Sequence, residues 1–211
     1  MKFLNPNGPV FAFFNRVGDL IVLNLLYILC SIPFFTAGAS VTALYYVLLR
    51  MRRKQEVQVV KDFFHSFRQN LKQATALHLL LTVIAIILAL DLYVLWELME
   101  YDTFSKIILG VLAVLSVWFL SNCLYAFPLL AQFNNTIRGI LKNARFMSLK
   151  HFAYTIAMLL VTAAPWIAGL YVPYLLEWVL FIYLFIGFSG IAYFNSRYFV
   201  TIFDQYISNR E

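Results

Sequence analysis

The chain has 211 residues, of which 63% are hydrophobic and only 12% are charged, whereas a soluble domain carries about 25% charged residues. With a mean hydropathy of +0.79, this composition excludes a soluble globular domain. The net charge of +6 needs no nucleic-acid partner, because basic loops beside anionic lipid account for it.

Five tracts contain no charged residue when histidine is counted as neutral. They cover 20–49, 73–90, 107–137, 151–176 and 178–196. A membrane-spanning helix needs about 20 apolar residues, and five such tracts cannot share one small soluble core. We therefore expect an all-α polytopic membrane protein of five or six membrane segments, with 1–211 forming a single membrane domain.

The first long apolar stretch, at 18–51, is interrupted by proline and glycine. As one upright helix it is too long for a bilayer. Pro33 removes a helical hydrogen bond and Gly38 favours a further bend. We predict a broken helix or hairpin with arms at 18–34 and 38–51. The sequence leaves open whether 18–51 forms two spans or one displaced, re-entrant segment.

Two polar side chains stand near the start of this stretch. Asp19 lies three residues after Arg16, on the same helical face, and is expected to anchor the membrane boundary or to contact a lipid headgroup or a partner. Asn24 lies deeper and must find its hydrogen bonds within protein. We expect Asn24 to link two helices.

Basic residues are concentrated in two connections, and acidic residues in the others. The basic connections are 50–73 and 132–151. The positive-inside rule places both in the cytoplasm and the acidic turns outside. The spans at 74–96 and 152–173 then run outward, those at 104–129 and 178–197 run inward, and the C-terminus is cytoplasmic.

Each basic connection contains an amphipathic helical pattern that leads into an outward span. The two patterns cover 60–74 and 137–147. Such a helix either rests on lipid headgroups or docks into a groove of a cytoplasmic partner. The candidate partner-binding residues are Phe63, Phe64, Ser66, Phe67, Asn70, Gln73, Arg138 and Lys142.

These two connections also suggest an internal repeat. A shift of 78 residues aligns "DLYV" at 91–94 with "GLYV" at 169–172. The two units would begin with residues 57–103 and with residues 136–178. Each would contain an amphipathic helix, an outward span, an acidic turn and an inward span. Chance alignment of leucine-rich spans is the alternative.

Few residues suggest chemistry inside the membrane. Asp91 is a carboxylate within an outward span, which favours either a functional contact or a place at the outer interface. Cys30 and Cys123 have no CxxC partner and the histidines lack metal-ligand spacing. We find no catalytic set or phosphate loop, and therefore expect no enzyme activity, no metal and no cofactor.

The N-terminal third is similar to one family. The stretches "FNRVGDLIVLNLLYILCSIPFFTAGASVTALYY" (14–46) and "FFHSFRQNLKQAT" (63–75) resemble the YesL family of bacterial membrane proteins. The residues that carry the resemblance include Asn15, Gly18, Asp19, Asn24, Pro33, Thr36, Gly38, Tyr45, Ser66, Asn70 and Gln73. The resemblance implies a multi-pass protein of the bacterial cytoplasmic membrane, of a kind found beside carbohydrate importers.

That implication favours an accessory or structural subunit of a carbohydrate importer of the ATP-binding-cassette (ABC) class. Its expected partners are membrane lipid, the permease and the nucleotide-binding subunits, with no nucleic acid. The alternative is an independent small transporter or permease-like homo-oligomer. A polar path through the spans would favour the transporter, and the sequence offers Asn24, Asp91, Asn122 and Gln132 for it.

The topology is directly testable with reporter fusions. Reporters placed after Lys54, after Asn143 and at Glu211 should read cytoplasmic, and those after Asp102 and Tyr174 should read external, because of the charge asymmetry of the connections. An external signal after Asn143 would contradict the whole arrangement.

Overall fold

The computed structural model describes residues 9–98 and 103–208, which form helices and short connections without any strand. The helices are α1 (Pro9–Ser31), α2 (Ala37–Arg52), α3 (Val59–Leu98), α4 (Thr103–Gln132), α5 (Ile137–Lys150), α6 (Phe152–Tyr171), α7 (Pro173–Ile182) and α8 (Phe188–Ser208). A 3₁₀ turn, η1 (Phe34–Thr36), precedes α2, and a π-helical turn, η2 (Tyr183–Gly187), joins α7 to α8. The all-α fold expected from composition is confirmed.

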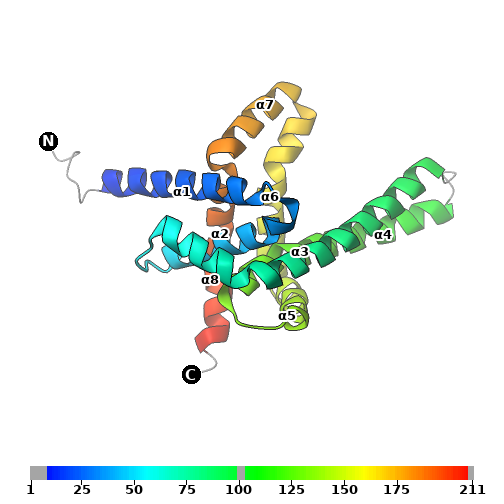
Figure 1. Cartoon of the computed structure of the whole chain (residues 1–211). Coiled ribbons are helices and arrows are strands. Elements are labelled where there is room, and N and C mark those ends of the chain that lie inside the picture. Colours follow the sequence, from blue (N-terminus) through cyan, green and yellow to red (C-terminus); the bar gives the residue numbers. More distant parts are fainter. Residues whose placement is uncertain (1–8, 99–102, 209–211) are drawn as a thin grey trace.

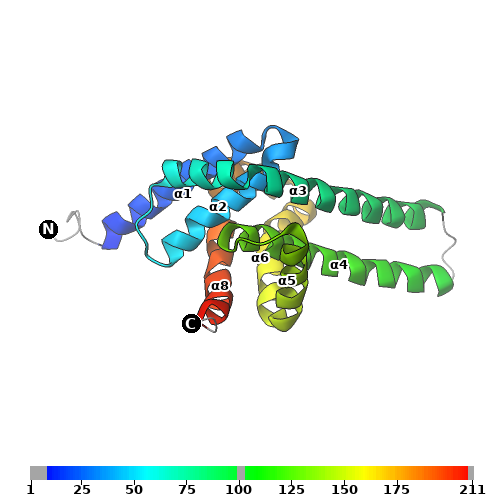
Figure 2. The ribbon, with the colours of Figure 1, turned by 60° about the horizontal axis from the view of Figure 1, so that its bottom comes forward.

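The predicted break in the first apolar stretch lies where proline and glycine indicated it. α1 ends at Ser31, and α2 runs back beside α1 as the second arm of a hairpin (Figure 2). The Thr36 hydroxyl donates to the carbonyl oxygens of Cys30 at 2.6 Å and Pro33 at 2.8 Å. These bonds satisfy backbone groups that the break releases, which an apolar environment requires.

Helix α2 is the centre of the molecule. It packs most extensively against α3 and also contacts α1, α4 and α8. Eleven of its sixteen residues are buried, among them the small residues Gly38, Ala39, Ser40, Thr42 and Ala43. Small side chains allow the neighbouring backbones to approach closely, as expected for this segment.

Helix α3 differs from the arrangement expected for an interfacial helix followed by a span. The amphipathic stretch 60–74 is the first part of one uninterrupted helix of 40 residues, about 60 Å long at 1.5 Å per residue. This length is about twice the roughly 30 Å hydrocarbon core. The start of α3 lies beside α2, whereas its end leaves the body together with α4 (Figure 2).

The second amphipathic stretch forms a separate helix, α5, as expected. Its N-cap, Thr136, accepts a hydrogen bond from the backbone N–H of Gly139 at 3.2 Å. The chain bends at His151 before α6 begins. The Thr155 hydroxyl holds this bend, because it donates to the Ser148 carbonyl at 2.9 Å and lies 2.9 Å from the Tyr125 hydroxyl of α4.

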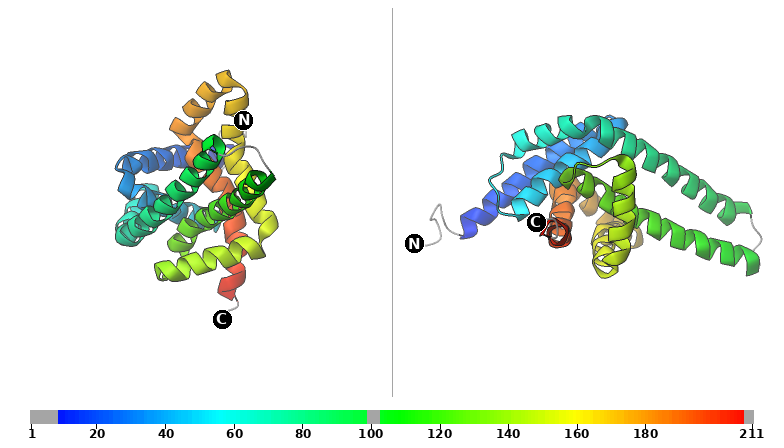
Figure 3. Two further views of the ribbon diagram at one scale, coloured as in Figure 1. Left: turned by 90° about the vertical axis from the view of Figure 1, so that its right-hand side faces the viewer. Right: turned by 90° about the horizontal axis from the view of Figure 1, so that it is seen from below.

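Two helical arms leave the core in different directions. The α3–α4 arm extends to the right in Figure 1 and the α6–α7 arm extends upward, while α5 and the end of α8 lie at the bottom. In Figure 3 the left view shows the α6–α7 arm above the rest of the molecule, and the right view shows α3 and α4 leaving the core together. Large apolar side chains are exposed along both arms, as expected for lipid-facing helices.

Six helical stretches of the described residues are long and apolar enough to cross a membrane. They are Val10–Ser31, Phe34–Arg52, Val59–Glu97, Thr103–Gln132, Phe152–Tyr171 and Tyr174–Ile207. The count agrees with a multi-pass protein and with two arms in the first hairpin. The internal repeat and the cytoplasmic side of the basic segments stay predictions.

The close approach of α3 to Gly38 of α2 leads to a stability prediction. A Cβ atom built at Gly38 would lie 2.5 Å from the Ala74 carbonyl oxygen and 2.6 Å from His78 Cβ, whereas one at Gly110 has nothing within 4 Å. Gly38→Ala should therefore destabilise the fold by about 1–3 kcal/mol through overpacking. Gly110→Ala, the control, should be neutral or stabilising, because alanine is the better helix former.

Thermal melting of the detergent-solubilised variants measures the difference. We also expect Gly38→Leu to be more damaging than Pro33→Ala, because the exposed Pro33 contacts little. A Gly38→Leu protein with unchanged membrane level and melting temperature would refute the close approach as a constraint.

Candidate functional site

Asn24 forms the polar junction that ties the first helix to the last. Its Nδ2 donates to the carbonyl oxygens of Tyr183 and Leu184, both at 3.0 Å, and its Oδ1 accepts from the backbone N–H of Ser189 at 3.0 Å. A π-helical turn interrupts the regular backbone pairing, and Asn24 supplies partners at this interruption. The Ser189 hydroxyl donates to the Leu20 carbonyl at 2.8 Å and completes the junction.

The predicted partner-binding residues of α3 divide into two groups. Phe63 and Ser66 are completely buried in the core, whereas Phe64, Phe67, Asn70 and Gln73 are half-buried. In this conformation Phe63 and Ser66 stabilise the packing and do not reach a partner. Partner binding stays a prediction for the remaining positions.

The polar residues of this stretch have bonding partners within the chain. Asn70 Nδ2 donates to the carbonyl oxygen and to the hydroxyl of Ser66, at 3.0 and 3.2 Å. Gln73 Nε2 donates to the Asn135 carbonyl oxygen and so joins α3 to the connection before α5. These contacts give a structural reason for polar residues at positions that lipid would not recognise.

The exposed face of α3, opposite these buried and internally bonded residues, is available to a partner. An open depression of about 620 Å³ is lined by Lys61, Phe64, His65, Arg68 and Gln69. On α5, the predicted contact residues Arg138 and Lys142 are exposed. Together these residues form two basic surfaces that face outward from the core.

The two predicted membrane carboxylates occupy different surroundings. Asp19 is half-buried on α1, whereas Asp91 is exposed on the outer part of the α3–α4 arm. The ion pairs of the described residues are Arg50–Asp62 at 2.8 Å and Arg53–Asp204 at 2.7 Å, so neither predicted carboxylate is paired. Asp19 directly precedes Leu20 of the Asn24 junction, whereas Asp91 lies far from it along α3.

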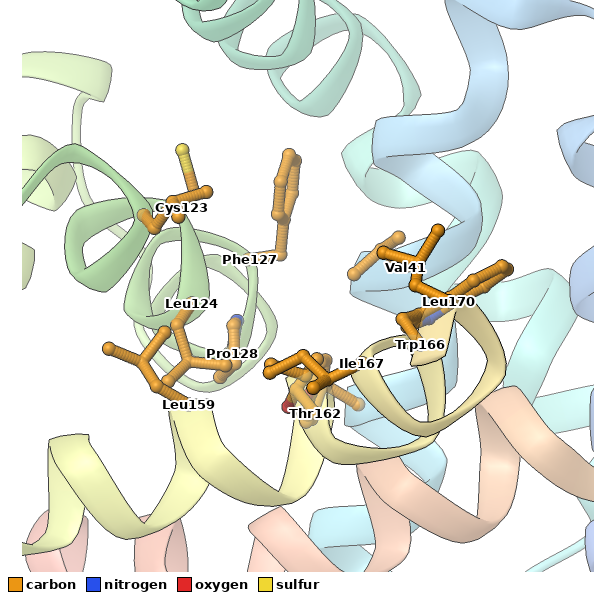
Figure 4. A pocket seen from close by; sticks show the side chains of 13 residues that line it. Val41, Cys123, Leu124, Phe127, Pro128, Leu159, Thr162, Trp166, Ile167 and Leu170 are labelled. Carbon is orange, nitrogen blue, oxygen red and sulfur yellow. The ribbon is translucent and has the colours of Figure 1, made fainter. Parts of the chain in front are cut away.

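An apolar groove lies between the two arms. It has a volume of about 480 Å³, its walls come from α4 and α6, and Val41 and Tyr45 of α2 form its floor. Figure 4 shows Phe127 and Leu124 of α4 facing Ile167 of α6 across the opening. The lining is mostly hydrocarbon, and Tyr45, Cys123, Thr162 and Trp166 are the lining side chains that can form hydrogen bonds.

The remaining titratable residues form no recognisable metal or catalytic site in the part of the chain described. No group of three or more His, Cys, Asp or Glu side chains lies close enough to hold a metal ion there. His151 Nε2 lies 3.3 Å from the Tyr206 hydroxyl. Burial, and secondarily the neighbouring Lys150 charge, lower the pKa of His151 and favour its neutral form.

The fold and its apolar arms define a multi-pass, all-α membrane protein. In a comparison with known proteins, residues 20–92 match the family described as "Protein of unknown function, DUF624", which is the YesL-type family. The YesL resemblance inferred from the sequence is thereby confirmed for the segment that contains Asn24, Pro33, Gly38 and most of α3.

A second comparison extends the similarity beyond this segment. The chain is 27% identical to the uncharacterized protein YteU of Bacillus subtilis (strain 168) over 156 residues, which cover 72% of this chain and 68% of that protein. No solved structure matches the chain. The similarity therefore concerns sequence and family, without an experimental fold for comparison.

Sequence reasoning found Asn24 but missed its partners. The π-helical turn at 183–187 has no glycine–proline signal at its start and lies in an ordinary apolar run. Gly187 provides the one local signal, because a Cβ there would lie 2.7 Å from the Tyr183 ring.

The junction at Asn24 predicts a large effect of removing its side-chain amide. Asn24→Leu should destabilise the protein by about 1–3 kcal/mol, because backbone groups at the π-helical turn lose their partners. Asn122→Leu is the matched control, since among the described residues Asn122 Nδ2 donates to the Trp118 carbonyl of its own helix and joins no second helix. Equal melting temperatures for the two variants would contradict a junction role for Asn24.

Proposed function

We propose that this protein is an accessory or structural membrane subunit of a carbohydrate ABC importer. It packs its apolar arms against the permease within the bilayer and presents its basic surfaces to the cytoplasmic subunits. The YesL-type resemblance supports the carbohydrate context, because it implies proteins found beside such importers.

The observation that carries this proposal is the apolar groove between α4 and α6. Its lining offers few hydrogen-bonding groups to a sugar, whose hydroxyls would lose their water without replacement. A membrane helix of a partner presents hydrocarbon side chains, which suit this lining. The groove therefore favours a packing role over a substrate path.

The polar groups of the membrane region support the same role. Both the nitrogen and the oxygen of the Asn24 side-chain amide form hydrogen bonds at the junction before α8 and at its start. Asn195 Nδ2 donates to the Thr162 hydroxyl at 3.1 Å. These side chains hold helices together and do not line a continuous path. In membranes such bonds stabilise helix association.

The cytoplasmic part of the proposal rests on the outward faces of α3 and α5. The depression at Lys61, Phe64 and Arg68 combines an aromatic side chain with two cations. Helices of this kind dock into grooves of partner proteins. Arg138 and Lys142 extend the basic character onto α5.

A small permease-like homo-oligomer is the alternative, and Thr162 and Tyr45 in the groove are the observation that favours it. In that case a second copy of the chain would occupy the groove, and the paired grooves would enclose these hydroxyl groups. Purification distinguishes the two functions, because one yields permease subunits and the other yields only this chain.

The decisive experiment is affinity purification of the tagged protein from its native membrane with two matched variants. Ala163→Trp fills the groove, whereas Ala168→Trp places the same side chain on an exposed part of α6 outside it. We expect the wild type and Ala168→Trp to recover permease subunits, and Ala163→Trp to lose most of them.

The membrane levels of the three proteins must be equal for the comparison. Recovery of permease subunits by Ala163→Trp at the wild-type level would remove the groove from the proposal. Recovery of this chain alone, in every sample and under mild detergent, would contradict the accessory role and favour the homo-oligomer.

A further inference from the structure

Three arginines from three helices gather around Tyr193 of α8, away from the apolar groove. The guanidinium carbon of Arg52 lies 3.6 Å from the centroid of the Tyr193 ring, and that of Arg16 lies 5.9 Å from it. The positive charges of Arg197 and Arg16 both act on Arg52. Cations from α1, α2 and α8 thus share one small region of the surface.

Arg52 is fixed in place by its contacts with α8. Its Nε and Nη2 donate to the Tyr193 carbonyl oxygen at 3.1 and 2.7 Å, and Nε also lies 3.3 Å from the Ser196 hydroxyl. Its Nη1 has no hydrogen-bond partner among the described residues. A rigid guanidinium with a free donor is prepared to bind an anion.

None of the three arginines belongs to an ion pair among the described residues, although Asp19 follows Arg16 by three residues on α1. The two ion pairs of the described residues use the neighbouring arginines, Arg50 with Asp62 and Arg53 with Asp204. The positive charges of Arg16 and Arg197 disfavour the charged form of the neighbouring Arg52, and an anion bound beside them would relieve this repulsion. The guanidinium groups of Arg52 and Arg16 both lie near the Tyr193 ring, so an anion beside that ring would interact with more than one cation.

The position of the cluster suggests the source of the anion. Arg52 is the last residue of the apolar stretch Phe34–Arg52, and Arg16 lies near the start of Val10–Ser31. Just before Arg16, the phenylalanines of α1 are exposed, with 49% of Phe11, 64% of Phe13 and 65% of Phe14 accessible. Basic sites between helices at the cytoplasmic side of a membrane bind anionic headgroups.

We propose that Arg16, Arg52 and Arg197 bind the phosphate group of an anionic phospholipid. Tyr193 holds Arg52 in its binding position. Arg16 and Arg197 add the charge that distinguishes an anionic headgroup from a zwitterionic one. The site stands independently of the accessory role, because it requires no protein partner.

Lipid binding to the purified full chain tests the site. Phosphatidylglycerol and phosphatidylcholine with identical acyl chains are titrated into the detergent-solubilised protein, and bound lipid is counted by native mass spectrometry. The double variant Arg16→Gln/Arg197→Gln removes two cations and leaves Arg52 packed. The control, Lys106→Gln/Arg145→Gln, removes two exposed cations elsewhere and gives the same net charge.

We expect the cluster variant to bind phosphatidylglycerol at least about tenfold more weakly than the control, a difference of roughly 1.4 kcal/mol. The wild type should prefer phosphatidylglycerol to phosphatidylcholine. Equal affinity of the two double variants for phosphatidylglycerol would overturn the proposal. If the double variant melts at a lower temperature than the control, the single variant Arg197→Gln, at an exposed position, is compared with Arg145→Gln instead.

Inorganic phosphate, added at millimolar concentration, distinguishes a headgroup from a soluble ligand. Failure of phosphate to displace phosphatidylglycerol from the wild type supports the lipid. If phosphate displaces phosphatidylglycerol from the wild type but not from the cluster variant, the arginines bind phosphate, and the lipid is overturned as the natural occupant of the site.

Discussion

The structure depends on burying one helix, α2, on nearly all of its sides. In a bilayer the hydrophobic effect does not drive helices together, so association relies on close packing and hydrogen bonds. The small residues of α2 permit such packing, most clearly at Gly38, where α3 approaches the backbone. The large residue Tyr45 packs edge-on against Phe199 of α8 on another side. The remaining helices are positioned by what they place against α2.

The charged end of α2 has two physical roles at once. Arg50 pairs with Asp62 of α3, and Arg53 donates to Asp204 of α8 and to Gln132 of α4. The same residues that indicate the cytoplasmic side therefore connect α2 to three neighbouring helices. A basic segment beside the membrane can determine orientation during insertion and then hold the folded helices together. Arg52 differs, because its contacts are an aromatic ring and backbone and side-chain oxygen atoms without negative charge.

The sequence predicted the elements more completely than their contacts. Charge-free tracts located the spans, and Pro33 marked the hairpin, because these are local properties of the chain. The pattern at 60–74 could not reveal that α3 continues without a break, since an apolar face looks the same against lipid and against another helix. For this reason Phe63 and Ser66 were predicted as contact residues and are buried instead. The π-helical turn depends on Asn24, which is about 160 residues away in the chain, and no local pattern contains that information.

The distribution of bonded and exposed groups separates the interior of this protein from its contact surfaces. Asn24, Ser189 and Thr155 form hydrogen bonds within the chain. Each bond fixes the relative position of two segments, which apolar packing alone specifies less precisely. The arms carry the opposite character, with large apolar side chains and almost no polar group to fix a partner's register. A partner in the groove would therefore gain affinity from shape and burial. Its specificity would come from the basic surfaces of α3 and α5, where hydrogen bonds and charge can discriminate. The two properties lie on different parts of the molecule, so a substitution can weaken one without altering the other.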